Sequence, residues 1–228
     1  MMKNKLTVAE LSKMIDHTLL NNHISNEELK ALCETAKKYN FKTVAINNAP
    51  IPYCAEQLKG SDVLVDAAVS FPLGQSTIET KVFEAIDAIE KGAGEVDYVV
   101  NLVEIKNGNW DYVEDEMSRI VSACSERKIT SKVIFETCFL TEDEKVKLCQ
   151  IALKVRPTFV KTSTGFGTAG ATVADVALMK SIVGDNVKIK AAGGIRNIDD
   201  ALALIEAGAN RIGTSKGCEI VDGYKKML

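Results

Sequence analysis

The chain has 228 residues, 46% of them hydrophobic and 26% charged, and its formal net charge is −3. This apolar content is ample for one sizeable core and marginal for two domains. No basic stripe suggests nucleic acid, and no run of about 18 apolar residues suggests a membrane span. Polar and acidic residues follow the first six positions, where a signal peptide would carry its apolar core. We therefore expect one cytoplasmic globular domain that binds neither nucleic acid nor membrane.

The cysteines and histidines exclude several kinds of site. Six cysteines are scattered without a C-x-x-C pair, which is typical of reduced thiols in the core of a cytosolic protein. Only two histidines are present, His17 and His23, so a histidine-rich metal site is excluded. A Ser-His-Asp triad could use only one of them, and the G-x-S-x-G nucleophile elbow is missing. We expect no metal in this protein.

In chain order, the predicted elements begin with a short helix over Thr7–Ile15 and continue as strands that alternate with amphipathic helices. The strands are nearly continuous runs rich in Val and Ile, which is typical of parallel strands buried on both faces. The eight predicted strands are Lys13–Thr18, Phe41–Asn47, Val63–Phe71, Glu95–Asn101, Lys132–Thr137, Thr158–Ser163, Val187–Ala192 and Arg211–Thr214.

Start and stop signals bound the helices between these strands. Spacing of the capping-box type predicts helix starts at Ser25, Ser76, Thr141 and, with Asp in place of Glu, Asn197. Glycines that would end helices are Gly60, Gly92 and Gly208. The helix predicted over Ile78–Lys91 has a buried face made of Val82, Ala85, Ile86 and Ile89.

Strict alternation with a repeat of about 28 residues allows a doubly wound sheet or a (β/α)8 barrel. Eight strands in this length favour the TIM barrel. No linker or break in composition divides residues 1–228, so we expect one barrel domain. The helix over Thr7–Ile15 is expected to cover the bottom of the barrel.

Two lysines stand at the ends of successive predicted strands. Lys161 lies where a β-branched and aromatic run gives way to Thr, Ser and Gly, which is where a barrel strand opens into its active-site loop. Lys190 repeats this pattern before Gly193 and Gly194. Burial disfavours an ammonium group unless something compensates for it. Either lysine alone could extend its charge to solvent, but the pair followed by glycines indicates amine chemistry on a carbonyl.

Six motifs, in order along the chain, resemble those of the deoxyribose-phosphate aldolase family. They are Ile15–Leu20, Ser70–Gly74, Gly94–Asn101, Val133–Thr137, Phe159–Gly165 and Lys190–Arg196. The resemblance implies a class I, Schiff-base aldolase on a TIM barrel that needs no cofactor. Its implied reaction is the reversible cleavage of 2-deoxy-D-ribose 5-phosphate to acetaldehyde and D-glyceraldehyde 3-phosphate, in deoxyribose phosphate catabolism. It leaves the oligomeric state open, with a homodimer or a homotetramer to be considered.

The resemblance also implies the catalytic residues. Lys161 would form the imine, and Lys190 would hold it deprotonated. A lysine of pKa ~10.4 is neutral about 0.04% of the time at pH 7, and lowering the pKa by about three units raises this to roughly a third. Asp97 would relay protons, with a structural counter-ion as the alternative, and Asp16 would support the substrate hydroxyls and the lysines. Strand parity alone does not separate Lys190 from Lys188.

A phosphate site is expected in the loops after the seventh and eighth strands, where barrels often bind phosphate. The expected phosphate-binding residues are Gly165, Gly193, Gly194, Gly213 and Ser215. Thr18 and Asn101 are weaker candidates, each equally well explained as a loop anchor.

Three positions raise further questions. Ala45 stands where many family members carry a cysteine, and Lys216 stands where a second serine is frequent. The tail with Tyr224 is expected to fray, the alternative being that Tyr224 folds over the barrel mouth. Alternative functions are another phosphate-binding Schiff-base aldolase or transaldolase, and a catalytically silent barrel that senses a sugar phosphate.

Overall fold

Eight parallel strands close into a barrel in the order β1 to β8, with β8 paired to β1. The structure is a computed structural model that describes residues 6–228; the predictions for the first five residues lie outside this range. The strands are β1 Ile15–Thr18, β2 Thr43–Asn47, β3 Leu64–Val69, β4 Ala93–Val99, β5 Thr130–Ile134, β6 Phe159–Lys161, β7 Lys188–Ala192 and β8 Arg211–Thr214. The predicted TIM barrel and all eight predicted strands are therefore confirmed.

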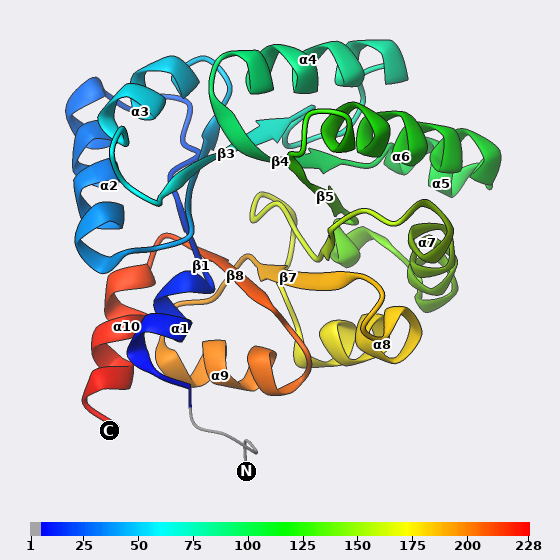
Figure 1. Cartoon of the computed structure of the whole chain (residues 1–228). Helices are drawn as coiled ribbons and strands as arrows, with labels where there is room; N and C mark the ends of the chain where they lie inside the picture. Colours follow the sequence, from blue (N-terminus) through cyan, green and yellow to red (C-terminus); the bar gives the residue numbers. More distant parts are fainter. Residues whose placement is uncertain (1–5) are drawn as a thin grey trace.

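Helices surround this barrel (Figure 1). They are α1 Val8–Lys13, α2 Asn26–Tyr39, α3 Ile51–Gln57, α4 Ile78–Glu90, α5 Leu102–Lys106, α6 Trp110–Ser125, α7 Glu142–Val155, α8 Val173–Val183, α9 Ile198–Glu206 and α10 Gly217–Lys225, with a 3-10 turn η1 at Thr137–Phe139. Within residues 6–228, no helix is both long and apolar enough to cross a membrane. The six cysteines are free thiols, and four of them are buried.

The capping predictions are confirmed at three helix starts. Ser25 and Thr141 each form a complete capping box, and the Asn197 side chain accepts the amide of Asp200. The prediction at Ser76 is wrong by one residue, because Thr77 is the cap of α4 and accepts the amide of Thr80. The adjacent hydroxyls of Ser76 and Thr77 gave two possible positions for the cap of this helix, and the sequence could not separate them.

The buried face of α4 is rotated from the predicted one. Ala85 is buried as expected, but Val82, Ile86 and Ile89 are only partly buried. The most buried positions include Lys81, whose ammonium donates to Val99 O and Glu116 Oε1, both at 2.7 Å. A lysine with a buried carboxylate partner can lie inside a helix packing face, whereas a hydrophobic pattern treats it as exposed.

Several predicted strands extended too far toward their carboxyl ends. β3 ends at Val69, β4 at Val99 and β5 at Ile134, and the chain then turns through residues of positive φ at Ser70 and Glu136. These turns are buried. The apolar pattern continues through them because burial continues, although the ladder has ended.

The two ends of the described chain lie side by side, with α1 packed on α10 (Figure 1). Thr7 caps α1 in a full capping box, and α1 leads directly into the amino-terminal end of β1. Tyr224 lies in α10, is buried and donates its hydroxyl to Leu6 O at 2.7 Å. Both readings of the tail were therefore wrong, because Tyr224 neither frays nor reaches the barrel mouth.

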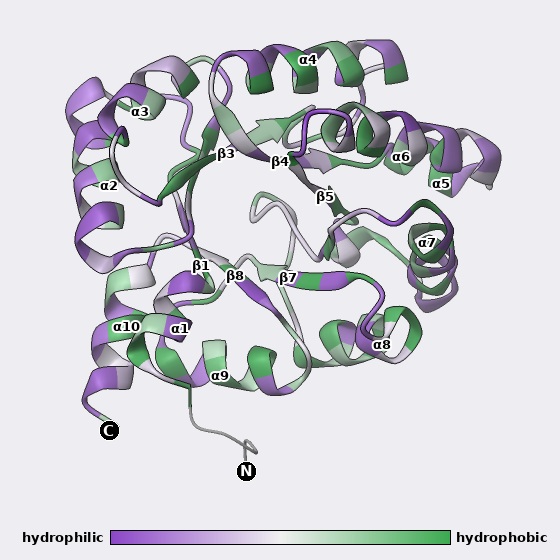
Figure 2. Cartoon of the chain, in the orientation of Figure 1, coloured by the Kyte–Doolittle hydropathy of each residue, from purple (hydrophilic) through white to green (hydrophobic). Residues whose placement is uncertain are grey.

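The strand register aligns charged residues inside the barrel. Asp97 lies opposite Lys132, Lys161 opposite Lys190, and Lys190 opposite Arg211. Hydrophilic and hydrophobic segments alternate along β7, and β8 also carries a hydrophilic segment (Figure 2). Since alternate residues of a strand share one face, neighbouring strands bring these charges together in the barrel interior.

Candidate active site

A cavity of about 450 Å³ opens among the loops at the carboxyl ends of the strands, and Lys161 lies at its inner end. The Lys161 side chain is 5% exposed. Of the other predicted site residues, the cavity lining includes Thr18, Gly165, Gly193, Gly194, Gly213 and Ser215. Asp97, Lys190 and Asp16 do not line the cavity and are almost fully buried.

Lys161 contacts a network of buried charges. Its ammonium Nζ lies 2.5 Å from Asp97 Oδ2, and Lys190 Nζ donates to the same oxygen at 2.7 Å. Lys190 Nζ also forms an ion pair at 2.5 Å with Asp16 Oδ2, without the geometry of a hydrogen bond. The four residues implied by the family resemblance as catalytic are therefore adjacent in the structure.

Four further charged residues complete this network, and the sequence analysis missed them. Lys132 Nζ lies 2.7–2.8 Å from Asp66, Glu95 and Asp97. Arg211 Nη1 lies 2.7 Å from Asp16 Oδ1 and 2.9 Å from Glu95 Oε2. We call the eight residues the interior charge cluster: Asp16, Asp66, Glu95, Asp97, Lys132, Lys161, Lys190 and Arg211.

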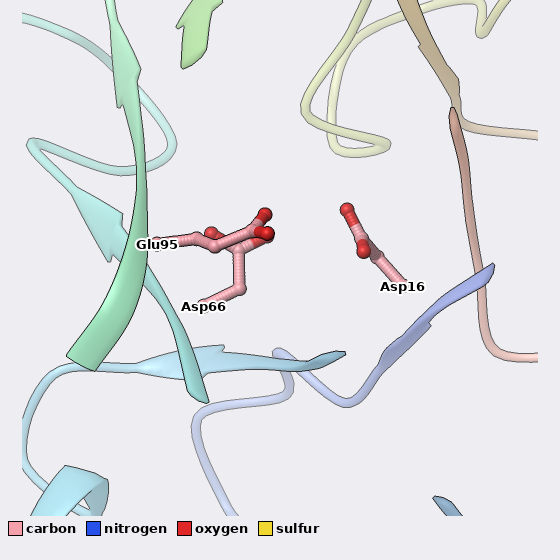
Figure 3. A group of neighbouring side chains, drawn as sticks. All are labelled: Asp16, Asp66 and Glu95. Atoms are coloured by element: carbon pink, nitrogen blue, oxygen red, sulfur yellow. The ribbon is translucent and has the colours of Figure 1, made fainter. Parts of the chain in front are cut away.

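Three of these carboxylates converge closely enough to suggest a metal site. Asp16, Asp66 and Glu95 project from β1, β3 and β4 into the barrel interior (Figure 3), and one oxygen of each lies within 4.8 Å of the others. Each already lies between two cations of the cluster: Lys190 and Arg211 at Asp16, Lys132 and Lys190 at Asp66, and Lys132 and Arg211 at Glu95. The side chains of the protein thus supply the positive charge that this carboxylate group requires.

The cluster shifts the proton affinities of its members. Burial lowers the pKa of Lys161, Asp97 opposes this effect, and Lys190 adds to it. Burial would raise the pKa of Asp97, but Lys132, Lys161 and Lys190 together hold it well below its usual range. The pKa of Lys190 is raised, because Asp16, Asp66 and Asp97 outweigh its burial. The ammonium is therefore stabilised at Lys190, whereas the shift at Lys161 is toward the neutral amine.

The loops after β7 and β8 form the other end of the cavity. Gly193 and Gly194 have φ of +87° and +78°, a conformation that L-residues with a side chain rarely adopt. A Cβ at Gly194 would meet no protein atom within 4 Å, so this backbone is open to the cavity. Helix α9 begins nearby with its cap at Asn197, and its N-terminal end favours an anion. Two cationic residues, Arg196 and Lys216, also line this cavity.

Besides its predicted place at the phosphate end of the cavity, Gly213 has a second role that the sequence did not indicate. A Cβ there would lie 2.9 Å from Ala192 Cβ and 3.2 Å from Lys190 Cε. The glycine therefore leaves room for the Lys190 side chain to reach the cluster, besides lining the cavity.

The structure separates several open alternatives. Lys188 is exposed at the start of β7, with its Nζ 5.7 Å from the centroid of the Phe159 ring, whereas Lys190 is buried. Asn101 is the N-cap of α5, where its Oδ1 accepts the amides of Val103 and Glu104, and it does not line the cavity. Its loop-anchor interpretation is the one that fits. Thr18 donates to Asp16 O at 2.9 Å and also lines the cavity.

Glu136 positions the loop that follows Lys161. Its backbone is left-handed with φ of +55°, and its carboxylate accepts the Thr164 amide at 3.2 Å and the Thr164 hydroxyl. Glu136 was recognisable as an acidic residue at the end of an apolar run, whereas Asp66 and Lys132 stand inside their strands. Among the eight strands, charges at alternate positions occur only on β4, at Glu95 and Asp97, and on β7, at Lys188 and Lys190, so this pattern alone does not identify the whole cluster.

The closed parallel barrel, with its cavity at the carboxyl ends of the strands, defines a TIM-barrel enzyme. A family model described as DeoC/LacD family aldolase matches residues 11–222. The chain belongs to this family, whose general mechanism uses a lysine Schiff base.

The similarity to known proteins covers nearly the whole chain. A deoxyribose-phosphate aldolase of Lactobacillus acidophilus is 54% identical over 97% of this chain and 93% of its own length. One from Caldanaerobacter subterraneus is 50% identical over 100% of this chain and 99% of its own. The solved structure of a tetrameric deoxyribose phosphate aldolase from Aeropyrum pernix superposes with a TM-score of 0.89 at 29% identity, covering 97% of this chain and 94% of that one.

Proposed function

We propose that this protein is a class I aldolase that reversibly cleaves 2-deoxy-D-ribose 5-phosphate to acetaldehyde and D-glyceraldehyde 3-phosphate through an imine at Lys161. The observation that carries the proposal is the position of Lys161. Among the lysines of residues 6–228, it alone both lines the cavity and contacts the interior charge cluster. A buried amine with an opening to a cavity can be neutral and can still reach a carbonyl.

In the proposed mechanism, the neutral amine of Lys161 attacks the aldehyde carbon of the open-chain sugar. Asp97 moves a proton to the carbinolamine oxygen, which leaves as water and gives an iminium ion. Asp97, ionised by that step, then accepts the proton of the C3 hydroxyl through a water and later returns it to the enamine carbon, and loss of this proton breaks the C2–C3 bond. The electron pair passes to the iminium as an enamine, and D-glyceraldehyde 3-phosphate departs. Protonation of the enamine carbon and hydrolysis release acetaldehyde and restore Lys161.

Lys190 and Asp16 support this chemistry without touching the aldehyde. The Lys190 ammonium stands one carboxylate away from Lys161 and disfavours a second positive charge there. Asp16 lies between Lys190 and Arg211 and fixes the position of Lys190. In this proposal, the backbone amides near Gly193, Gly194 and Gly213 and the hydroxyl of Ser215 bind the phosphate at the far end of the cavity.

Covalent trapping tests the proposal. Borohydride with acetaldehyde is expected to leave a reduced adduct on the peptide that contains Lys161, and the protein is expected to turn over 2-deoxyribose 5-phosphate in a coupled assay. An adduct on Lys190 or Lys188 would overturn the assignment of the nucleophile. Trapping without turnover of this sugar would favour another Schiff-base aldolase or a transaldolase, and failure of both would favour a sugar-phosphate sensor.

We further propose that the protein acts in the cytoplasm as a homodimer or a homotetramer. Free thiols at all six cysteines are typical of a reducing compartment. The tetrameric relative from Aeropyrum pernix supports self-association. Light scattering on the eluting peak of a size-exclusion column would measure the mass directly, and a monomer mass would contradict this part of the proposal.

A further inference from the structure

Asp66 lies inside the interior charge cluster, remote from the cavity. It is on β3, its side chain has no exposed surface, and its two oxygens lie 2.8 Å from Lys132 Nζ and 2.9 Å from Lys190 Nζ. The mechanism above assigns it no step. A buried carboxylate that serves only as a counter-ion is a weak contributor to stability, so another role for Asp66 has to be considered.

The charge balance of the interior charge cluster indicates that one of its carboxyls takes up a proton. The cluster contains four carboxylates and four basic groups. When Lys161 becomes a neutral amine, three cations face four carboxylates inside a closed barrel. An uncompensated buried charge is costly, and a buried group normally takes up a proton instead. The nucleophilic state of Lys161 therefore favours a proton on one of the four carboxyls.

Asp66 is the best placed of the four to take that proton. Asp16 and Glu95 each contact Arg211, whose guanidinium does not give up its charge. Asp97 is surrounded by three lysines. Within residues 6–228, Asp66 forms ion pairs with two lysines and with no arginine. Burial, followed by the nearby charge of Asp97, raises the pKa of Asp66 to about 6, whereas the pKa values of Asp16 and Asp97 are lowered.

A continuous chain of short contacts joins Lys161 to Asp66. Lys161 Nζ lies 2.5 Å from Asp97 Oδ2, this oxygen lies 2.7 Å from Lys190 Nζ, and that nitrogen lies 2.9 Å from Asp66 Oδ2. Each neighbouring pair is a donor and an acceptor, so a proton can pass from one end to the other without entering water.

We propose that Asp66 is a positioning residue that holds the proton given up by Lys161 and returns it when the imine forms. Lys161 transfers a proton to Asp97, Lys190 transfers one to Asp66, and Asp97 then restores the Lys190 ammonium. The net change is one proton moved from Lys161 to Asp66. On addition of an aldehyde, the reverse transfer converts the neutral amine and the carbonyl into an iminium ion and water, and leaves Asp66 ionised.

This inference rests on the proposed function, since it requires an imine at Lys161. The charged groups that face Asp66 across the barrel come from six other strands: Asp16 on β1, Glu95 and Asp97 on β4, Lys132 on β5, Lys161 on β6, Lys190 on β7 and Arg211 on β8. Their summed charge sets the proton affinity of Asp66. A nearby cation favours the ionised carboxyl, so loss of the Lys161 charge raises the proton affinity of Asp66 further.

Two measurements on the whole protein near neutral pH test the proposal with acetaldehyde as the probe. Infrared difference spectra are expected to show the carbonyl band of a protonated carboxyl disappearing as the iminium forms. A pH indicator in weak buffer is expected to show no net proton uptake by the wild type. Asp66→Asn cannot hold the proton, so this variant is expected to lack the band and to take up about one proton per iminium from solution.

A matched control is Glu116→Gln. Glu116 is also fully buried and paired with a lysine, but it lies between α4 and α6, away from the cluster. This control is expected to show the wild-type band and no proton uptake. Proton uptake by the wild type, or an Asp66→Asn variant that behaves as the control does, would overturn the inference.

If Asp66→Asn fails to fold, the infrared spectrum of the wild type alone tests the role of Asp66. A band that does not change when acetaldehyde is added overturns the inference. Borohydride trapping under the same conditions separates the two proposals. Absence of an adduct at Lys161 removes the proposed function, whereas an adduct without the carboxyl band removes only the role of Asp66.

Discussion

Two of the buried lysines, Lys81 and Lys161, pair with carboxylates in very different surroundings. Lys81, between α4 and α6, donates to Glu116 and to Val99 O, while Glu116 Oε2 accepts the Asn101 amide at 3.0 Å. Lys161 contacts one carboxylate and opens to the cavity. Burial lowers the pKa of both lysines. A lowered pKa alone therefore does not identify a reactive lysine, whereas access to a cavity separates the two.

The neighbours of the two lysines differ in a second way. The Lys81–Glu116 pair is closed, because backbone groups of the β4–α5 connection take the remaining hydrogen bonds. Lys161 is one member of a network in which three cations share Asp97. Proton affinity can be redistributed within such a network, but not within an isolated pair. The closed Lys81–Glu116 pair suits a structural anchor, and the network around Lys161 suits chemistry.

The largest effect is expected from Lys161→Ala. Loss of the nucleophile is expected to reduce kcat by more than about 10⁴-fold, as is typical when an essential covalent group is removed. The fold is expected to survive, because Asp97 keeps Lys132 and Lys190 as partners. Coupled turnover and thermal unfolding measure the two effects. Retained turnover would mean that cavity access does not mark the reactive lysine.

The next effect concerns the phosphate end of the cavity. Three charge-assisted hydrogen bonds at about 1.5–3 kcal/mol each predict that unphosphorylated 2-deoxyribose is worse in kcat/KM by roughly 10³-fold or more. Gly194→Val is expected to erase most of this preference, because its side chain would occupy the space open to the ligand. Acetaldehyde is still expected to trap on Lys161.

Gly60→Val is the matched control for this prediction. Gly60 has φ of +76° and also has no protein atom within 4 Å of a Cβ, so valine brings comparable backbone strain there. It follows α3 and does not line the cavity. Equal loss of the phosphate preference in both variants would attribute the effect to strain rather than to phosphate binding.

A smaller effect is expected for Lys190→Leu. Its kcat/KM near neutral pH should fall roughly 10²-fold or more, by analogy with removal of an acid–base partner. Removing this cation raises the pKa of Lys161, so the amine stays protonated to higher pH. The acidic limb of the kcat/KM profile should move to higher pH, and activity should partly recover as pH rises. Lys188→Leu, which removes the exposed lysine of the same strand, should leave the profile unchanged. An unmoved limb in Lys190→Leu would give Lys190 another role.

Sequence patterns were sufficient for the barrel because every strand and most helix starts carry local signals. The boundaries at Val69 and Ile134 were not predictable, since apolar residues continue through the buried turns beyond them. Lys161 and Lys190 were recognisable because glycines follow them. Asp66 and Lys132 stand within strands without such a marker, and only the closed barrel brings them into contact.

The smallest effect on turnover, and a large one on stability, is expected for Lys81→Met. Removing one partner of a buried pair leaves Glu116 uncompensated, which typically costs about 3–5 kcal/mol. For a chain of this size this corresponds to a fall in Tm of very roughly 6–20 °C. The double variant Lys81→Met with Glu116→Leu should recover much of the loss, because it removes the orphaned charge as well. Turnover per folded molecule should stay near the wild-type value in both variants. A large fall in kcat at temperatures where Lys81→Met is fully folded would show that the α4–α6 pair also reaches the chemistry, and the distinction between the two lysines would then fail.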